Sequence, residues 1–350
     1  MAKVKDFKQY LIVLAFSLIF SGCAGQQVKM QTLGSDSGEL LGTTVCDNPF
    51  EQMYPAIDEN RVVWVDYRNS MSYNNGDIYL SSLTMKRQDE ICLNGANQTA
   101  PHISGDKVVW QDMRNDLGDI YLYDLTLQKE IAICKFRSLQ SDPRINQQRI
   151  VWVDTRNGSQ NIYMYDLDQE REYQITDTPK SQVSPDIYGN YIVYEDNSKG
   201  AVDSDIILYD FATGERKQLT SNHSYQKTPR IHGNYIVWSD GRHGNSEIYL
   251  YDITLGQETR ITHNKAEQYF PSIWGDNIVW TDERNGNQDI CMYNIKTRME
   301  YQVTTHVAPQ SRPSIWSSKI VWMDKGNEHQ SNWDIKMYRI PKHLVTYATH

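Results

Sequence analysis

The chain repeats one short phrase seven times, and this repetition restricts its fold more than any other feature. Each copy begins with Gln, two further residues and Pro. It continues through Ile/Val-Val-Trp-x-Asp to Asp-Ile-Tyr-x-Tyr-Asp, or near equivalents. A fixed period in the low forties, made of short strand-like runs, is typical of a β-propeller or a similar repeat array. The anchoring glutamines are 42 to 46 residues apart: Gln52, Gln98, Gln140, Gln182, Gln226, Gln268 and Gln310.

The sixth copy shows how a repeat divides into four strands. We expect strands over residues 271–274, 277–281, 289–295 and 298–304, with a tight turn at Gly275-Asp276. Four antiparallel strands make one propeller blade. No apolar period of 3.6 residues persists after Ser35 for more than a turn or two. The chain is therefore predicted to be all-β, a seven-bladed β-propeller of four-stranded antiparallel blades rather than a six-bladed one.

The two ends of the repeat region predict how the ring closes. Residues 43–52 align without gaps to residues 259–268, so residues 42–46 look like a fourth strand without its own first three. The last copy has its first three strands within residues 314–340. An N-terminal strand that completes the seventh blade would remove exposed sheet edges. Residues 344–348 offer a competing strand.

The first forty residues are predicted to lie outside the propeller. Residues 1–23 combine a basic start, an apolar stretch over 10–20 and the sequence Ser21-Gly22-Cys23. This ending resembles the lipobox of prokaryotic lipoproteins, although Phe20 stands where that family usually has Leu. We expect export, lipidation of Cys23 and membrane anchoring on the extracytoplasmic side; signal cleavage nearby or an uncleaved anchor are the alternatives. Residues 24–40 read as a flexible tether, and residues 41–350 as one propeller domain.

Charge restricts the partners. The formal net charge is −9, and lysines and arginines do not cluster. Nucleic-acid binding needs clustered cations to displace counterions, so nucleic acid is not an expected partner. Membrane contact is expected only through the N-terminal anchor. A protein or a cell-envelope polymer remains the expected partner.

A family resemblance rests on the repeat itself. The block over residues 282–290, with Ile278-Val279-Trp280 before it and an Arg260-Ile261-Thr262-type ending, resembles the TolB-type, WD40-like β-propeller repeat. The resemblance covers about residues 42–340 and implies the propeller fold. TolB has six blades behind a separate α/β domain, where this chain has a leader and a tether. The resemblance therefore implies a fold more than a function.

Five Asp-x-Arg loops recur around the predicted ring. Five copies cannot all be one active site, so we interpret each as a turn held by an Arg–carboxylate pair. The alternative is calcium binding by Asp282, Asn285, Asn287 and Asp289, but Arg284 stands where a ligand would be needed. The five pairs are Asp66/Arg68, Asp112/Arg114, Asp154/Arg156, Asp240/Arg242 and Asp282/Arg284.

The cysteines are predicted to be structural. Cys46, Cys92 and Cys134 each lie six residues before a repeat glutamine, so they occupy equivalent places on successive blades. Equivalent points on neighbouring blades are too far apart for a disulfide. Cys291 replaces a repeat Tyr and is expected in the core. There is no Cys-x-x-Cys, nucleophile elbow or Gly-rich phosphate loop. No catalytic residue, metal or cofactor is predicted.

Candidate binding residues lie where the copies differ. Directly after the prolines come His102, Arg144, Asp186 and Arg230, and two positions further come Tyr188 and His232. With Tyr269 and Phe270, these are expected to meet at one mouth of the central channel. They could bind a small anionic or sugar-like ligand, or a partner loop. The alternative is a solvated channel in which the charges pair with one another.

Two functions follow from this pattern. The first is a non-enzymatic, envelope-tethered module that binds a protein or an envelope polymer. The second is a carbohydrate-active propeller enzyme, a lyase or glycosidase, which needs an acid/base pair near the channel. His102, Asp186 and His232 are the candidates for that pair.

Overall fold

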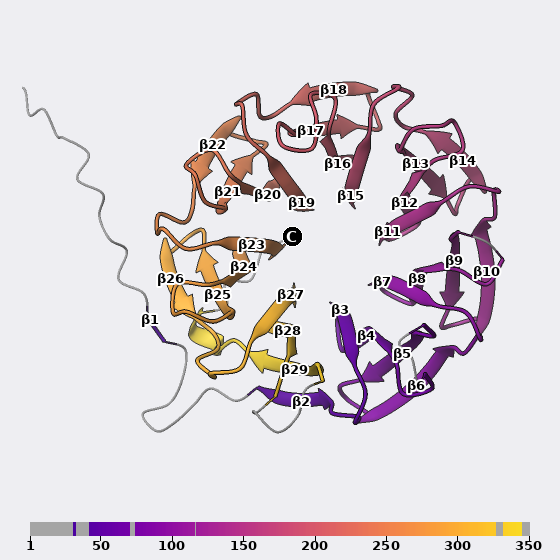
Figure 1. Ribbon diagram of the computed structural model, residues 1–350, viewed down its shortest axis with the longest axis horizontal. Helices are drawn as coiled ribbons and strands as arrows, with labels where there is room; N and C mark the ends of the chain where they lie inside the picture. Colours follow the sequence, from indigo (N-terminus) through magenta and orange to yellow (C-terminus); the bar gives the residue numbers. More distant parts are fainter. Residues whose placement is uncertain (1–30, 33–41, 71–73, 116, 327–331, 345–350) are drawn as a thin grey trace, which may run out of the picture.

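A computed structural model describes residues 31–32, 42–70, 74–115, 117–326 and 332–344. Seven four-stranded antiparallel blades form a ring, and the first strand of each full repeat lies innermost (Figure 1). The predicted seven-bladed propeller is confirmed. Blades one to three contain β3(Gln52–Asp58), β4(Arg61–Asp66), β5(Asp77–Ser82) and β6(Arg87–Cys92); β7(Gln98–Ser104), β8(Lys107–Asp112), β9(Asp119–Asp124) and β10(Lys129–Cys134); and β11(Gln140–Asn146), β12(Arg149–Asp154), β13(Asn161–Asp166) and β14(Arg171–Gln174).

The remaining blades keep the same plan. Blades four to six contain β15(Gln182–Tyr188), β16(Tyr191–Asp196), β17(Asp205–Asp210) and β18(Glu215–Gln218); β19(Gln226–His232), β20(Tyr235–Asp240), β21(Glu247–Asp252) and β22(Gln257–Arg260); and β23(Gln268–Trp274), β24(Asn277–Asp282), β25(Asp289–Asn294) and β26(Met299–Gln302). Blade seven contains β27(Gln310–Trp316), β28(Lys319–Asp324), β29(Asp334–Arg339) and the N-terminal β2(Thr43–Cys46).

The ring closes as the sequence predicts. Strand β2 pairs antiparallel with β29, with Thr43 opposite Met337 and Cys46 opposite Ile335. The N-terminal end of the propeller thus supplies the outermost strand of the C-terminal blade (Figure 1). Lys342–Leu344 form a 3₁₀ turn, η1, and the rest of the competing segment lies outside the described residues.

Little of the predicted leader and tether is described. Residues 1–23, including Cys23, lie outside the described residues. Of residues 24–40, the structure describes only β1(Gln31–Thr32), which pairs in parallel with β26 of blade six. Within the described ranges, no helix is long and apolar enough to cross a membrane.

The most repeated residues form the scaffold. A tryptophan in the second strand of six blades is at most 1% exposed. Its indole nitrogen donates to the aspartate two residues later, as in Trp280 to Asp282 at 2.8 Å. That aspartate also pairs with the arginine of the Asp-x-Arg loop, and the N–O distances in the five loops are 2.5–2.6 Å. The interpretation of these loops as turns held by ion pairs is confirmed.

The loop over residues 282–289, considered above as a calcium site, is held by hydrogen bonds between its own residues. Asn285 donates to Asp289 at 2.8 Å, and both Arg284 nitrogens that face Asp282 are bound to it. The buried thiols Cys46, Cys92 and Cys134 are free, and each accepts a hydrogen bond from an arginine of the following blade. Cys291 is fully buried, as predicted.

Candidate functional site

The innermost strands surround a central channel with a cavity of about 710 Å³. Each of these strands carries a β-bulge at its proline, where the pairing register shifts. A bulge bends the strand and redirects a side chain. The residue before the proline has a positive φ of 50–56° in all seven blades: Tyr54, Ala100, Asp142, Ser184, Thr228, Phe270 and Arg312.

The channel wall has three tiers, which we name by their place on the innermost strand. The pre-proline tier includes Tyr54, Asp142, Phe270 and Arg312. The middle tier follows the prolines: Ala56, His102, Arg144, Asp186, Arg230, Ser272 and Ser314. The turn tier lies two residues further: Asp58, Ser104, Asn146, Tyr188, His232, Trp274 and Trp316. Since a strand rises ~3.3 Å per residue, the middle and turn tiers are about 7 Å apart.

Seven of the eight predicted binding residues line this one cavity, but they are spread along the channel and do not all meet at one mouth. Tyr188 and His232 belong to the turn tier, at the opposite end of the channel from Phe270, because an extended strand carries its two ends to opposite faces of the ring. Tyr269 does not line the cavity. Its hydroxyl contacts Glu283 and accepts a hydrogen bond from Gln288 at 2.8 Å, in the loop between β24 and β25.

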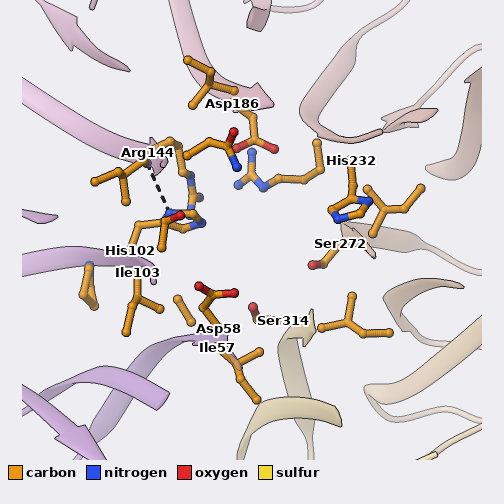
Figure 2. A pocket seen from close by; sticks show the side chains of 18 of the residues that line it. Ile57, Asp58, His102, Ile103, Arg144, Asp186, His232, Ser272 and Ser314 are labelled. Carbon is orange, nitrogen blue, oxygen red and sulfur yellow. Dashed lines mark hydrogen bonds between the residues drawn. The ribbon is translucent and has the colours of Figure 1, made fainter. Parts of the chain in front are cut away.

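Two middle-tier residues connect neighbouring blades. His102 Nδ1 accepts from the backbone N–H of Ile145 at 3.3 Å, and Asp186 Oδ2 accepts from that of Ile231 at 2.9 Å. Figure 2 shows His102, Arg144 and Asp186 on one side of the channel and the small Ser272 and Ser314 across from them. Because Nδ1 is an acceptor, the neutral His102 ring carries its proton on Nε2.

The surroundings of these two residues shift their pKa values in opposite directions. Burial, and then the charges of Arg144 and Arg230, hold the pKa of His102 well below its usual range. Burial raises the pKa of Asp186, although both arginines oppose that rise. His102 is therefore a neutral structural acceptor at physiological pH.

The turn tier makes the same kind of contact between blades. Asp58 accepts from the N–H of Gly105 at 2.5 Å, Asn146 from Gly189 at 2.9 Å, and His232 Nδ1 from Gly275 at 3.0 Å. Each acceptor lies on one blade and each donor on the next. All three enzyme candidates, His102, Asp186 and His232, thus bind backbone of the neighbouring blade.

The channel arginines are different. Within the described part of the chain, Arg144, Arg230 and Arg312 have no carboxylate within 4.0 Å, unlike the loop arginines. Arg230 donates to the carbonyl oxygen of Pro229 at 2.7 Å, and Arg312 lies over the rings of Phe270 and Tyr54 at 4.0 and 4.9 Å. Burial and the nearby Arg230 charge lower the pKa of Arg144 to about 10, so it remains protonated at neutral pH. The three guanidinium groups line the cavity without an ion-pair contact among the described residues, although the charge of Asp186 acts on Arg144 and Arg230.

Four turn-tier rings form a continuous aromatic wall over blades four to seven. The ring centroids of Tyr188 and His232 are 4.6 Å apart, those of His232 and Trp274 5.3 Å, and those of Trp274 and Trp316 5.7 Å. Successive rings are tilted by 41–50°, so the wall is curved. Each ring is partly exposed to the channel. The remaining turn-tier residues are polar, and this mouth is therefore amphipathic.

The described residues include no group of three or more His, Cys, Asp or Glu side chains placed to hold a metal ion. The arrangement suits binding by charge and by aromatic contact. The channel offers arginines and apolar rings, and its histidines and its middle-tier aspartate are occupied in the scaffold.

Comparison with known proteins supports the fold. No family model matches the sequence, and no curated protein matches it. Among solved structures, TolB from Acinetobacter baumannii has a TM-score of 0.54 and 17% identity over 73% of this chain and 66% of that one. The fold is a TolB-like β-propeller. This chain spans just under two thirds of that TolB.

Two other propellers have similar scores. The β-propeller domain of the Trilobed protease from Pyrococcus furiosus has a TM-score of 0.66 and 12% identity, over 82% of this chain and 95% of that one. An oligogalacturonate lyase solved with manganese has a TM-score of 0.62 and 11% identity, over 86% and 92%. At such identities the likeness concerns the fold alone.

The sequence pattern identified most of the residues that line the channel, but it did not show which of them are available to a ligand. Arg312, Trp274 and Trp316 were visible at axis positions without being predicted as binding residues. The signal that could have found them is the change of residue type between copies at the bulge and at the strand end. Which polar side chains are occupied by backbone donors could not be read from that pattern.

Proposed function

We propose that this chain is an exported, envelope-tethered, non-enzymatic binding protein that takes an anionic group of its partner into the central channel. The observation that carries the proposal is the set of three arginines, Arg144, Arg230 and Arg312, that line the cavity without a carboxylate within ion-pair distance among the described residues. A buried guanidinium gains most from a planar anion that it can bind with two hydrogen bonds.

The anchor is part of the same proposal. The basic and apolar leader, followed by Ser21-Gly22-Cys23, supports export and lipidation of Cys23. Fractionation of cells that express the chain with its leader tests this step. The wild type should remain with membranes and be released by detergent, and a C23A variant should lose that retention. Equal retention of both would show that membrane attachment does not need a lipid on Cys23, as an uncleaved anchor would also predict.

Partner binding is tested with the full chain, purified in detergent and used to capture material from envelope extracts. The double variant R144A/R230A removes two channel charges, and R137A/R171A removes two exposed charges from outside the channel as the matched control. Capture should be lost in the first and kept in the second. Equal capture by both would place the binding surface elsewhere.

The likeness to an oligogalacturonate lyase keeps a lyase or glycosidase as the second candidate. The residues of this chain do not fit a manganese ion such as that enzyme was solved with, since no suitable ligand cluster lies among the described residues. The hypothesis that the chain is an enzyme requires His102 or Asp186 to exchange a proton with a substrate. Turnover of an envelope polysaccharide by the wild type, abolished in H102Q or D186N, would favour it over the binding proposal.

A further inference from the structure

The channel contains two chemically different surfaces within one cavity. Arg144 and Arg230 lie in the middle tier, and the aromatic wall of Tyr188, His232, Trp274 and Trp316 lies one tier away. The two tiers are about 7 Å apart along the strands. Along the channel axis, the guanidinium groups and the rings are therefore close enough for one compact molecule to span.

The shape of the wall favours a puckered ring over a flat one. A flat base is held best by a parallel aromatic face, but neighbouring rings here are tilted by 41–50° and form a curved surface. Across the same mouth lie the polar side chains of Asp58, Ser104 and Asn146. An occupant of this mouth needs one apolar face and an edge rich in hydrogen-bonding groups.

The middle tier adds a requirement for negative charge. Ala56, Ser272 and Ser314 are the small residues of this tier, and they leave room in the cavity for an anionic group near the guanidinium groups of Arg144 and Arg230. The net charge of −9 disfavours a long polyanion along the outer surface. The anion must therefore be short, or the end of a longer chain.

These requirements together describe an acidic sugar. We propose that the channel binds a uronate-type ring, with its carboxylate on Arg144 and Arg230 and its apolar face on the Trp274–Trp316 part of the wall. The sugar enters from the turn-tier mouth, as a short oligosaccharide or as the terminal residue of an envelope polymer. This inference rests on the proposed function, because it names the partner whose anionic group enters the channel.

The test is a titration of the full chain followed by tryptophan fluorescence and by calorimetry. The ligands are β-1,4-linked triglucuronate and cellotriose, which differ only in oxidation at C6, with triglutamate and AMP as anions without an acidic sugar ring. We expect triglucuronate to bind about 10- to 100-fold more tightly than cellotriose, the gain typical of charge-assisted pairing. Its binding should also exceed that of triglutamate and AMP.

Two variants locate the site. R144A/R230A should reduce triglucuronate binding to the level of cellotriose, and R137A/R171A should leave it unchanged. W274A should weaken both sugars. If W274A fails to fold, the ligand series on the wild type decides alone. The acidic-sugar assignment is overturned if cellotriose binds as well as triglucuronate.

The remaining outcomes separate this inference from the proposed function. In one outcome, triglutamate or AMP binds at least as tightly as triglucuronate and loses that binding in R144A/R230A. This result would support an anion-binding channel and would overturn the acidic-sugar assignment. If none of the three anions binds and R144A/R230A still captures its partner from envelope extracts, both fail.

Discussion

Closure of the ring by β2 depends on a contact that only glycine permits. Gly42 lies directly before β2, against the indole of Trp322 in β28. A Cβ atom at residue 42 would overlap Trp322 Cη2, and would lie 2.6 Å from Trp322 Cζ2 and 2.9 Å from the carbonyl oxygen of Met337. Two of these atoms belong to a fully packed ring and one to backbone, so no flexible group can move aside.

The perturbation is Gly42→Val. Overpacking at a well-packed contact costs about 1–3 kcal/mol in the free energy of unfolding. We expect the melting temperature to fall by a few degrees, since 1 kcal/mol corresponds to roughly 2–4 °C in domains of 150–250 residues. The assay is thermal and urea unfolding followed by circular dichroism.

The matched control is Gly95→Val, because a Cβ atom at residue 95 meets no atom within 4 Å. That change should stay within about 0.5 kcal/mol of the wild type. A second control is Trp322→Phe, which removes both overlapping ring atoms. The cost of Gly42→Val should shrink in this background. Equal stability of the Gly42 and Gly95 variants, or an undiminished cost in the Trp322→Phe background, would refute the closure argument.

Three further results are expected from unfolding experiments. Arg144→Met should stabilise the fold by about 1 kcal/mol in urea, because burial and Arg230 disfavour the charge at residue 144; a loss of stability would contradict this. With the pKa of His102 lowered in the fold, the unfolded state binds more protons below pH 6.5, so stability falls on acidification. Protonation of His102 in the unfolded state should lower the free energy of unfolding by about 1.4 kcal/mol between pH 7.5 and 5.5. The His102→Gln variant should lack this part of the pH dependence. Arg284→Ala should lower the free energy of unfolding by about 3 kcal/mol, because it leaves the fully buried Asp282 without its ion pair. The control is Arg137→Ala, measured in the same way. Equal losses in the two variants would mean that the ion pair does not stabilise the fold.

The repeat alone was enough to predict the blades, their number and the way the ring closes. Copies of Ile-Val-Trp-x-Asp must bury both faces of their strand, and only neighbouring copies can cover them. The alignment of residues 43–52 with residues 259–268 identified the strand that lacked partners. Such features depend on local pattern and on counting, which the amino-acid sequence contains in full.

The roles of the channel residues were decided by the tertiary structure. His102 and Asp186 looked like reactive groups in the sequence, but each accepts an N–H from the next blade. The sequence left open whether the channel charges pair with one another, but no carboxylate lies within ion-pair distance of Arg144 in the described chain. Whether a polar side chain is occupied depends on backbone groups about 43–45 residues away, brought close only when the ring forms. The sequence determined which side chains reach the axis, and the packing of blade against blade determined which of them remain available to a ligand.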